Sequence, residues 1–313
     1  MAKTILALNN LHPLGLDGLE DGFTVLRLGR EHDPENAIQA HQNDIVGIVA
    51  SVGNTVSAKL IEALPNLEII SNFAVGVDNI DLAAADRRGV VVTNTPDVLT
   101  TDTADIALSL ILCAARRIVE ADAYVRVGKW HGGAMRLGTS LSGKTCGIVG
   151  LGRIGQAIAA RAAAFDMRIL YHGRTAKTHV PYEFCSSLHD MAAQSDFLVL
   201  ACAGGAETKH LVDEGILEAL GEKGYLINIA RGSVVDQDAL LIALQNKSLA
   251  GAGLDVYDNE PNVPESLFSM DNVVLLPHIG SATMETRRKM AQLVIDNIKA
   301  HFNGDPVKTP VAA

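Results

Sequence analysis

Three glycines with the spacing Gly150-x-Gly152-x-x-Gly155 stand between an apolar run, Thr145–Val149, and a helix-forming run that begins at Gln156. In a strand, turn and helix in this order, the first glycine permits a tight turn and the second leaves room for a pyrophosphate. The third lets the helix pack closely on the strand, and the backbone N–H groups at the start of the helix face the phosphates. The segment therefore predicts a dinucleotide-binding unit.

The end of the following strand indicates which dinucleotide is bound. An acidic residue there would hold the ribose 2′-hydroxyl of NAD, but the chain has no carboxylate between Asp166 and Glu183. Arg174, flanked by Gly173 and Thr175, lies instead where the 2′-phosphate of NADP would be. A solvated loop arginine is the alternative explanation. We expect NADP as the cofactor, with NADPH preferred over NADH.

Short aliphatic runs alternate with helix-forming stretches along the chain, which predicts parallel sheets with helices between the strands. The first group of predicted strands comprises Ile5–Leu8, Val25–Leu28, Val46–Val49, Leu67–Ser71 and Val90–Thr93. The second group comprises Thr145–Val149, Arg168–Tyr171, Phe197–Ala201, Tyr225–Ile229, Gly251–Val256 and Val273–Leu276. The predicted fold class is α/β, with two doubly wound parallel-sheet (Rossmann-like) domains and the active-site cleft between them.

The segment between the two groups marks a domain boundary. Residues 94–102 contain a proline and polar N-cap residues, and one long helix is expected from Thr103 to about Val127. A last helix, from Met284 to about Phe302, has no strand left to lead to, so we expect it to return to the first domain. The predicted substrate domain covers residues 1–98 and is completed by 284–313, and the dinucleotide-binding Rossmann domain covers 99–283.

Composition and charge exclude several classes of protein. The formal net charge of -10 gives no electrostatic attraction to nucleic acid or to an anionic membrane. The longest apolar run, Ile106–Ala115, is about half a membrane span, and the first residues carry no targeting signal. The four cysteines lack metal-binding spacing, so we expect reduced thiols in a cytoplasmic protein and no metal site.

Three segments late in the chain each follow a predicted strand and carry one ionisable residue: Arg231 before a glycine, Glu260 before a proline, and His278 after a proline. Open α/β sheets bind ligands at the carboxyl ends of their strands, so these side chains can converge. Taken singly, each residue has a structural explanation as a cap, a turn or an ordinary histidine. Their combination beside a dinucleotide site predicts a catalytic group.

The order of these motifs resembles the D-isomer-specific 2-hydroxyacid dehydrogenases, and within that family most of all the NADPH-dependent glyoxylate/hydroxypyruvate reductases and the hydroxyphenylpyruvate reductases. The resemblance covers nearly the whole chain and rests on residues 64–68, 73–81, 92–99, 150–155, 251–256 and 276–281. It implies that Arg231 binds the substrate carboxylate and polarises the ketone, that His278 protonates the alkoxide, and that Glu260 favours the protonated ring. These residue types suit the chemistry, because a 2-oxo acid needs a cation and a proton donor.

The resemblance implies further contacts to substrate and cofactor. The backbone N–H groups of Val75 and Gly76 would bind the substrate carboxylate, and Ser281 would touch the substrate. The residues expected along the pyrophosphate or at the nicotinamide carboxamide are Leu151, Arg153, Ile154, Ile229 and Asp255.

The resemblance also implies a homodimer formed by the dinucleotide-binding domain. Trp130 is either a core residue or a side chain that reaches the partner's active site, and the sequence leaves both open. The chain departs from the family at Ala203-Gly204-Gly205, where most relatives carry Pro-Leu-Thr. That loop lines the adenosine, so the departure suggests a looser hold on this half of the cofactor.

The predicted function is the NADPH-dependent reduction of small 2-oxo acids, glyoxylate and hydroxypyruvate, to D-2-hydroxy acids by hydride transfer. The first alternative is an aryl-pyruvate reductase of the same family, acting on phenylpyruvate or hydroxyphenylpyruvate. A formate dehydrogenase would carry Gln in place of Glu260. A dinucleotide-sensing corepressor, from another class, would carry long tails and an NAD carboxylate, and neither is found here.

Overall fold

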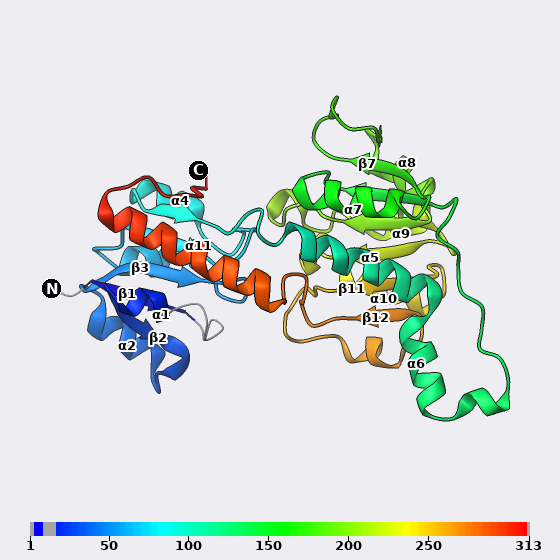
Figure 1. The fold of residues 1–313 in the computed structure, drawn as a ribbon, viewed down its shortest axis with the longest axis horizontal. Helices are drawn as coiled ribbons and strands as arrows, with labels where there is room; N and C mark the ends of the chain where they lie inside the picture. Colours follow the sequence, from blue (N-terminus) through cyan, green and yellow to red (C-terminus); the bar gives the residue numbers. More distant parts are fainter. Residues whose placement is uncertain (1–2, 9–16, 312–313) are drawn as a thin grey trace. The chain divides into compact units, whose positions relative to one another are not determined.

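The computed structural model describes residues 3–8 and 17–311, and the chain divides into two compact units (Figure 1). Unit 1 comprises Met1–Leu99 and Ser281–Ala313, and unit 2 comprises Thr100–Gly280. Each unit is built on its own sheet of parallel strands. The predicted α/β class with two parallel sheets is confirmed.

The sheet of unit 1 has five strands in the order β2-β1-β3-β4-β5. Its strands are β1 (Thr4–Ala7), β2 (Thr24–Arg27), β3 (Ile45–Ala50), β4 (Ile69–Asn72) and β5 (Val91–Thr93). Its helices are α1 (Asp17–Glu20), α2 (Pro34–His41), α3 (Ala58–Ala63), α4 (Leu82–Arg87) and α11 (Met284–Asn303). All residues of β1 and β4 are buried, because helices cover both faces of a parallel sheet.

The C-terminal part of the chain completes unit 1. Helix α11 packs against β4 and α1, and in Figure 1 it crosses the sheet of this unit. After α11, Val311 N–H donates to the carbonyl of Val92 over 2.8 Å. The hydroxyl of Thr309 donates to the carbonyl of Asn94 over 2.7 Å. The last residues therefore fasten the edge strand β5 and the loop that follows it.

The sheet of unit 2 has seven parallel strands in the order β12-β11-β10-β9-β6-β7-β8. Its strands are β6 (Thr145–Val149), β7 (Arg168–His172), β8 (Glu183–Phe184), β9 (Phe197–Leu200), β10 (Tyr225–Asn228), β11 (Gly251–Leu254) and β12 (Val273–Leu275). Its helices are α5 (Thr100–Arg116), α6 (Ile118–Arg126), α7 (Arg153–Ala163), α8 (Leu188–Ala193), α9 (Glu214–Leu220) and α10 (Gln237–Gln245). The order doubles back at β6, where strand order reverses and dinucleotide-binding sheets hold their ligand.

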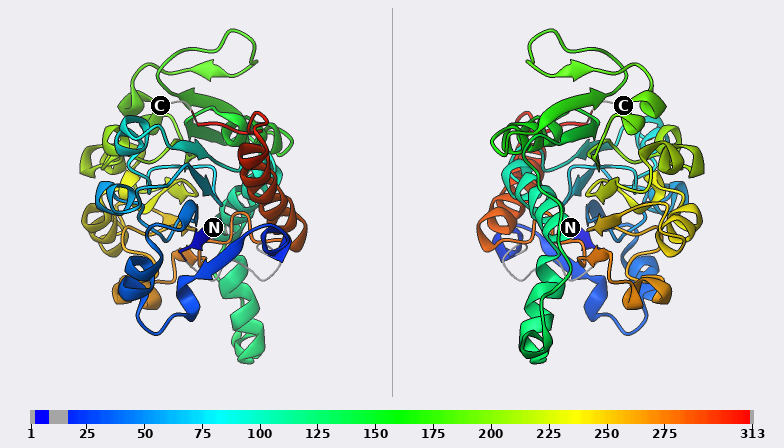
Figure 2. Two further views of the ribbon diagram at one scale, coloured as in Figure 1. Left: turned by 90° about the vertical axis from the view of Figure 1, so that its left-hand side faces the viewer. Right: turned by 90° about the vertical axis from the view of Figure 1, so that its right-hand side faces the viewer.

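Helices cover both faces of this sheet. On one face α5 and α7 pack side by side, and on the other α8, α9 and α10 form a second row. Two apolar clusters fill the spaces between sheet and helices. Helix α6 and the short 3-10 helix η3 (Lys129–Gly132) extend away from the sheet of unit 2 (Figure 2).

Two sequence expectations about unit 2 are wrong. The single helix expected over 103–127 breaks at Arg117, which has a left-handed backbone with φ of +55°. Its guanidinium pairs with Glu120 and donates to the carbonyl of Asp271 over 3.3 Å. The sheet has a seventh strand, β8, in addition to the six that were expected. Its two residues are too few to give a periodic pattern.

Among the described residues, no helix combines the length and the apolar character that crossing a bilayer requires.

Candidate active site

Three neighbouring strands of unit 2 lead into loops that carry the candidate catalytic residues. Arg231 follows β10, Glu260 follows β11 and His278 follows β12. The three strands are parallel and adjacent in the sheet. Their carboxyl ends therefore meet at one edge, where open α/β sheets bind ligands.

The imidazole of His278 is hydrogen-bonded to Glu260. His278 Nδ1 lies 2.7 Å from Glu260 Oε2, and both side chains are 30% exposed. Glu260 Oε1 also accepts a 3.0 Å hydrogen bond from the N–H of Tyr257. Because Nδ1 donates to the carboxylate, Nε2 is the ring nitrogen that can carry a transferable proton.

The surroundings of Glu260 keep its carboxylate ionised. Burial alone would raise the pKa of Glu260. The hydrogen bond and charge of His278, the N–H of Tyr257 and the charge of Arg231 outweigh burial and hold this pKa below its usual value. A negative charge is thus fixed behind the imidazole.

A buried asparagine shapes the loop that carries Arg231. Asn228 Nδ2 donates to the carbonyl of Arg231 over 2.9 Å, and Asn228 Oδ1 accepts from the N–H of Ala230 over 3.0 Å. Arg231 Nη1 donates to the carbonyl of Ala230 over 2.8 Å. Sequence analysis missed Asn228, although a polar residue that ends an apolar strand is a usable signal.

Asp255 fastens the loop that carries His278. Its two carboxylate oxygens accept from the N–H groups of Ile279, over 2.7 Å, and Gly280, over 2.8 Å. Burial raises the pKa of Asp255, against the opposing effects of these two hydrogen bonds and of the His278 charge. Sequence analysis assigned Asp255 only to the nicotinamide, and it did not foresee this structural contact.

The glycine motif joins β6 to α7 and leaves an open space in front of the helix. Gly150 has φ of +90°, and a Cβ on it would lie 2.6 Å from Cys202 Cα. A Cβ on Gly155 would lie 2.1 Å from the carbonyl oxygen of Gly150. A Cβ on Gly152, in contrast, would meet no described atom within 4 Å. Gly152 is also the N-cap of α7 and brings no side-chain acceptor. Gly150 and Gly155 pack tightly against their neighbours, whereas the space in front of the N–H groups at the start of α7 is open. This combination fits a pyrophosphate.

The other residues expected at the cofactor lie around the same edge of unit 2. Leu151 is buried, Arg153 and Ile154 start α7, and Ile229 directly follows β10. Arg174 is exposed in the loop after β7 and forms no ion pair with any described residue. Its neighbours Gly173 and Thr175 are partly or fully exposed.

The loop at Ala203-Gly204-Gly205 is held by one threonine. Thr208 Oγ1 donates to the carbonyl of Ala203 over 2.8 Å. The N–H of Thr208 donates to the carbonyl of Gly205 over 3.2 Å. Although the loop lacks proline, these contacts fix both of its ends.

In unit 1, one buried and two half-buried asparagines organise the loops that follow β3, β4 and β5. Asn72 Nδ2 donates to the carbonyl of Gly76, and Asn94 Nδ2 donates to the carbonyl of Val75, each over 2.8 Å. Asn79 Nδ2 donates to the carbonyl of Ser51 over 3.0 Å. Within the described part of the chain, the N–H groups of Val75 and Gly76 have no acceptor. Two adjacent N–H groups of this kind can bind a carboxylate.

The positions of the remaining candidate residues, Ser281 and Trp130, are as follows. Ser281 is partly exposed and directly follows Gly280. Trp130 is 70% exposed on η3, so it is not a core residue of this chain. Across residues 3–8 and 17–311, no three His, Cys, Asp or Glu side chains are placed to hold a metal ion.

The sequence of this chain is similar to those of known proteins. The family model described as "D-isomer specific 2-hydroxyacid dehydrogenase, NAD binding domain" matches residues 108–280. The glyoxylate/hydroxypyruvate reductase A of Arabidopsis thaliana is 50% identical over 293 residues, which are 94% of each chain. The hydroxyphenylpyruvate reductase of Plectranthus scutellarioides is 48% identical over 293 residues, again 94% of each chain.

A solved structure agrees in fold over the whole chain. The NADPH-dependent glyoxylate/hydroxypyruvate reductase of Sinorhizobium meliloti, in complex with NADP and malonate, is 45% identical and superposes with a TM-score of 0.94. The match covers 100% of this chain and 97% of that one.

Proposed function

The chain belongs to the D-isomer specific 2-hydroxyacid dehydrogenases, and we propose that it reduces glyoxylate and hydroxypyruvate to D-2-hydroxy acids with NADPH. The predicted family is confirmed, and the chain is an oxidoreductase that uses NADP. The observation that carries the proposal is the 2.7 Å hydrogen bond between Glu260 and His278. This hydrogen bond lies at the edge of the sheet formed by the carboxyl ends of β10, β11 and β12, and the loop that carries Arg231 leaves the sheet at the same edge.

Arg231 recognises the substrate and polarises its ketone. Its guanidinium presents several donors in a fixed fork, which suits a carboxylate beside a carbonyl oxygen. Asn228 holds the backbone of this loop in place. In unit 1, the open N–H groups of Val75 and Gly76 are further donors for a substrate carboxylate, and Ser281 is a candidate substrate contact.

His278 supplies the proton. Reduction adds a hydride to the carbonyl carbon and a proton to its oxygen, and Nε2 of the protonated ring donates that proton. Glu260 accepts from Nδ1 throughout, so it fixes the ring orientation and stabilises the ring while it is charged. Arg231 stabilises the negative charge that develops on the oxygen.

Unit 2 is the dinucleotide-binding domain in this proposal, and unit 1 is the substrate domain. Bound NADPH supplies the hydride. The open space at Gly152 and the start of α7 receive the pyrophosphate, and Leu151, Arg153, Ile154 and Gly155 line it. Gly173, Arg174 and Thr175 bind the 2′-phosphate. Ile229 and Asp255 contact the carboxamide.

A homodimer formed through unit 2 is part of the proposal. Helix α6 and the segment after it expose several large apolar side chains, namely Ile118, Val119, Val125, Val127, Trp130 and Leu137. Apolar groups gathered on one arm are typical of a protein interface, and a second copy of this chain covers them. All four cysteines are unpaired, which suits the proposed cytoplasmic location.

The experiment is a comparison of initial rates of NADPH and NADH oxidation with glyoxylate, hydroxypyruvate and phenylpyruvate. We expect NADPH to be oxidised with the first two substrates. A clear preference for phenylpyruvate would favour the aryl-pyruvate alternative, which the relative from Plectranthus represents. Cofactor binding without turnover of any of the three would contradict the proposal and favour a sensing protein.

A further inference from the structure

The segment after β7 closes on itself through one phenol. The backbone N–H of Lys177 donates to the hydroxyl of Tyr171 over 2.7 Å. The residues between them include Gly173, which is partly exposed, and Arg174 and Thr175, which are exposed. A side chain therefore replaces the backbone pairing that would otherwise hold a loop of this length.

The phenol is a rigid anchor because its ring is immobilised. Tyr171 is 1% exposed and lies on β7 within the core of unit 2. Its ring packs against Phe184 of the neighbouring strand β8, with the ring centroids 5.4 Å apart. A tyrosine has few rotatable bonds, so a buried ring fixes the position of its hydroxyl. Lys177 is thus tied to the sheet, while the three residues directly before it, Arg174, Thr175 and Ala176, are exposed.

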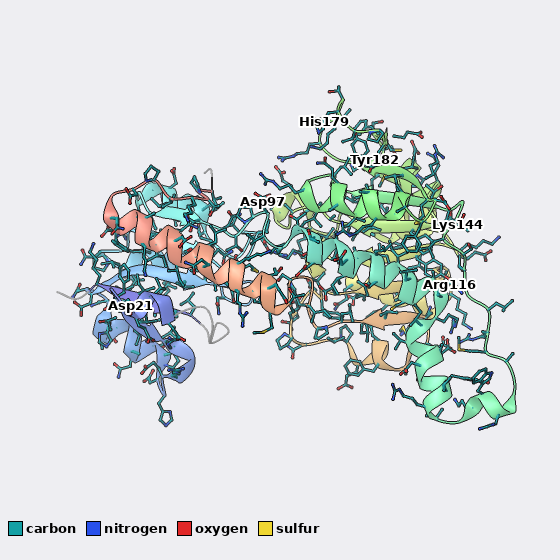
Figure 3. All side chains as sticks on the ribbon, in the orientation of Figure 1. Asp21, Asp97, Arg116, Lys144, His179 and Tyr182 are labelled. Carbon is teal, nitrogen blue, oxygen red and sulfur yellow. The ribbon has the colours of Figure 1, made fainter. Side chains whose placement is uncertain are left out.

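The same loop is joined to the glycine motif. Gly150 N–H donates to the carbonyl of His172 over 2.9 Å, and His172 Nδ1 lies 2.9 Å from the carbonyl of Cys185. His172 immediately follows Tyr171, so the start of the loop is fastened on both sides. In Figure 3, His179 marks the outer part of the segment that leads to β8, whereas Tyr182, directly before β8, packs against the apolar cluster that contains Tyr171. The start of the loop, at His172, is held in register with the glycine motif.

The charge of this loop suits an anion. Arg174 is exposed and has no carboxylate partner among the described residues. Arginine loses rotamer freedom on binding, and a loop held in place beforehand reduces the total ordering cost. The hydroxyl of Tyr171 can therefore affect only ligands that reach Arg174. In a dinucleotide, the group that would reach Arg174 is the 2′-phosphate.

We propose that Tyr171 is a positioning residue for 2′-phosphate recognition, because its hydroxyl holds the Lys177 backbone and so sets the loop that presents Arg174. This inference rests on the proposed use of NADPH. It adds a specificity determinant that touches no part of the cofactor and acts only through the loop.

The test is calorimetric binding of 2′,5′-ADP and 5′-AMP, two probes that differ only in the 2′-phosphate, to the wild type and to Tyr171→Phe. The variant keeps the packed ring and removes the acceptor of the Lys177 N–H. We expect affinity for 2′,5′-ADP to fall about 3- to 10-fold, the usual effect of one lost hydrogen bond. Affinity for 5′-AMP should stay within about 2-fold, and kcat with saturating NADPH should not change.

Two further variants make the result specific. Tyr225→Phe is the matched control, because the Tyr225 ring also packs against a phenylalanine and its hydroxyl lies 3.0 Å from Thr139 Oγ1, elsewhere in unit 2. It should leave the ratio of the two affinities unchanged. In an Arg174→Ala background, Tyr171→Phe should have no further effect on 2′,5′-ADP, because the two residues act as a unit.

The outcomes separate the inference from the proposed function. Equal loss of both affinities in Tyr171→Phe, or no loss of either, would overturn the role of Tyr171 while leaving the use of NADPH intact. A wild type that binds 2′,5′-ADP no more tightly than 5′-AMP would overturn both the inference and the cofactor preference.

Discussion

The backbone of Gly232 lies directly against that of Tyr257: a Cβ on Gly232 would stand 1.9 Å from the Tyr257 carbonyl carbon. Gly232 directly follows Arg231, and the N–H of Tyr257 donates to Glu260. This contact therefore couples the loop after β10 to the loop after β11. The two backbones are closer together than any residue with a Cβ at position 232 would allow.

Replacing Gly232 by alanine should separate these two loops. We expect Gly232→Ala to lower the free energy of unfolding by about 1–3 kcal/mol, as an overpacked core position does, and to reduce kcat/KM. Thermal denaturation and initial rates measure the two effects. Gly215→Ala on α9 is the control, because its new Cβ would meet only Asp213 Oδ1 at an ordinary 3.5 Å. Wild-type stability and activity in Gly232→Ala would show that the loops can move apart freely.

Removing the proposed proton donor should slow the chemical step and spare cofactor binding. We expect His278→Ala to lower kcat for glyoxylate reduction by about 10²- to 10⁴-fold, the usual contribution of a positioned acid. NADPH affinity, measured by fluorescence titration, should stay close to wild type. His189→Ala, which alters an exposed histidine on α8, should change neither quantity. Wild-type rates in His278→Ala would assign the proton to another group.

Glu260→Gln should change the pH dependence of both activity and stability. The protonated imidazole loses its counter-charge, so the alkaline limb of kcat/KM for reduction should move to lower pH. The pKa of Glu260 is lowered in the folded chain, so its ionised form adds stability above the ordinary glutamate range. That stability is lost as the pH falls through the lowered value. Urea unfolding should therefore show a wild-type advantage at neutral pH that shrinks in acid.

Glu222→Gln is the control for this variant, because Glu222 is exposed outside the site. Its pH–rate profile should match that of the wild type. An unshifted alkaline limb in Glu260→Gln would mean that the carboxylate only orients the ring.

Arg174→Ala should reduce the preference for NADPH. Losing a charge-assisted contact of about 1.5–3 kcal/mol should raise the KM for NADPH about 10- to 100-fold, while the KM for NADH stays unchanged. Arg168→Ala is the control, because Arg168 lies at the other end of β7 and pairs with Glu183 over 2.5 Å. If Arg174→Ala leaves the two KM values as they are in the wild type, the loop arginine is solvated and another group reads the phosphate.

The exposed apolar arm should control the oligomeric state. We expect Val119→Asp combined with Val127→Asp to convert a dimer to a monomer in analytical ultracentrifugation, because two charges would be buried in an apolar interface. Phe268→Asp is the control, since Phe268 is also exposed but lies on the 3-10 helix η6 (Glu265–Ser269). A dimer that survives the double substitution would place the interface elsewhere.

Features encoded over a few neighbouring residues were predictable from the sequence. The strand, glycine motif and helix around Gly150 are local, because each residue acts on its immediate neighbours. The candidate residues Arg231, Glu260 and His278 were selected by the same logic, since each lies in the loop that follows an apolar strand. The two parallel sheets could be predicted from the alternation of strand and helix patterns along the chain.

Features that depend on distant residues were not predictable. The break at Arg117 depends on the carbonyl of Asp271, which lies far along the chain. The attachment of the His278 loop depends on Asp255, and that of the Arg174 loop depends on the buried hydroxyl of Tyr171. A sequence shows that such residues are polar, but it does not show which backbone groups they will meet in the fold.

Unit 1 is assembled from the two ends of the chain, whereas unit 2 is one uninterrupted segment. During synthesis, residues 100–280 can reach their final structure as soon as they leave the ribosome. The sheet of unit 1 must wait for α11 and for the bonds from Thr309 and Val311 that fasten β5 and its loop. The part of unit 1 that precedes unit 2 in the chain is thus synthesised before unit 2 and completed after it.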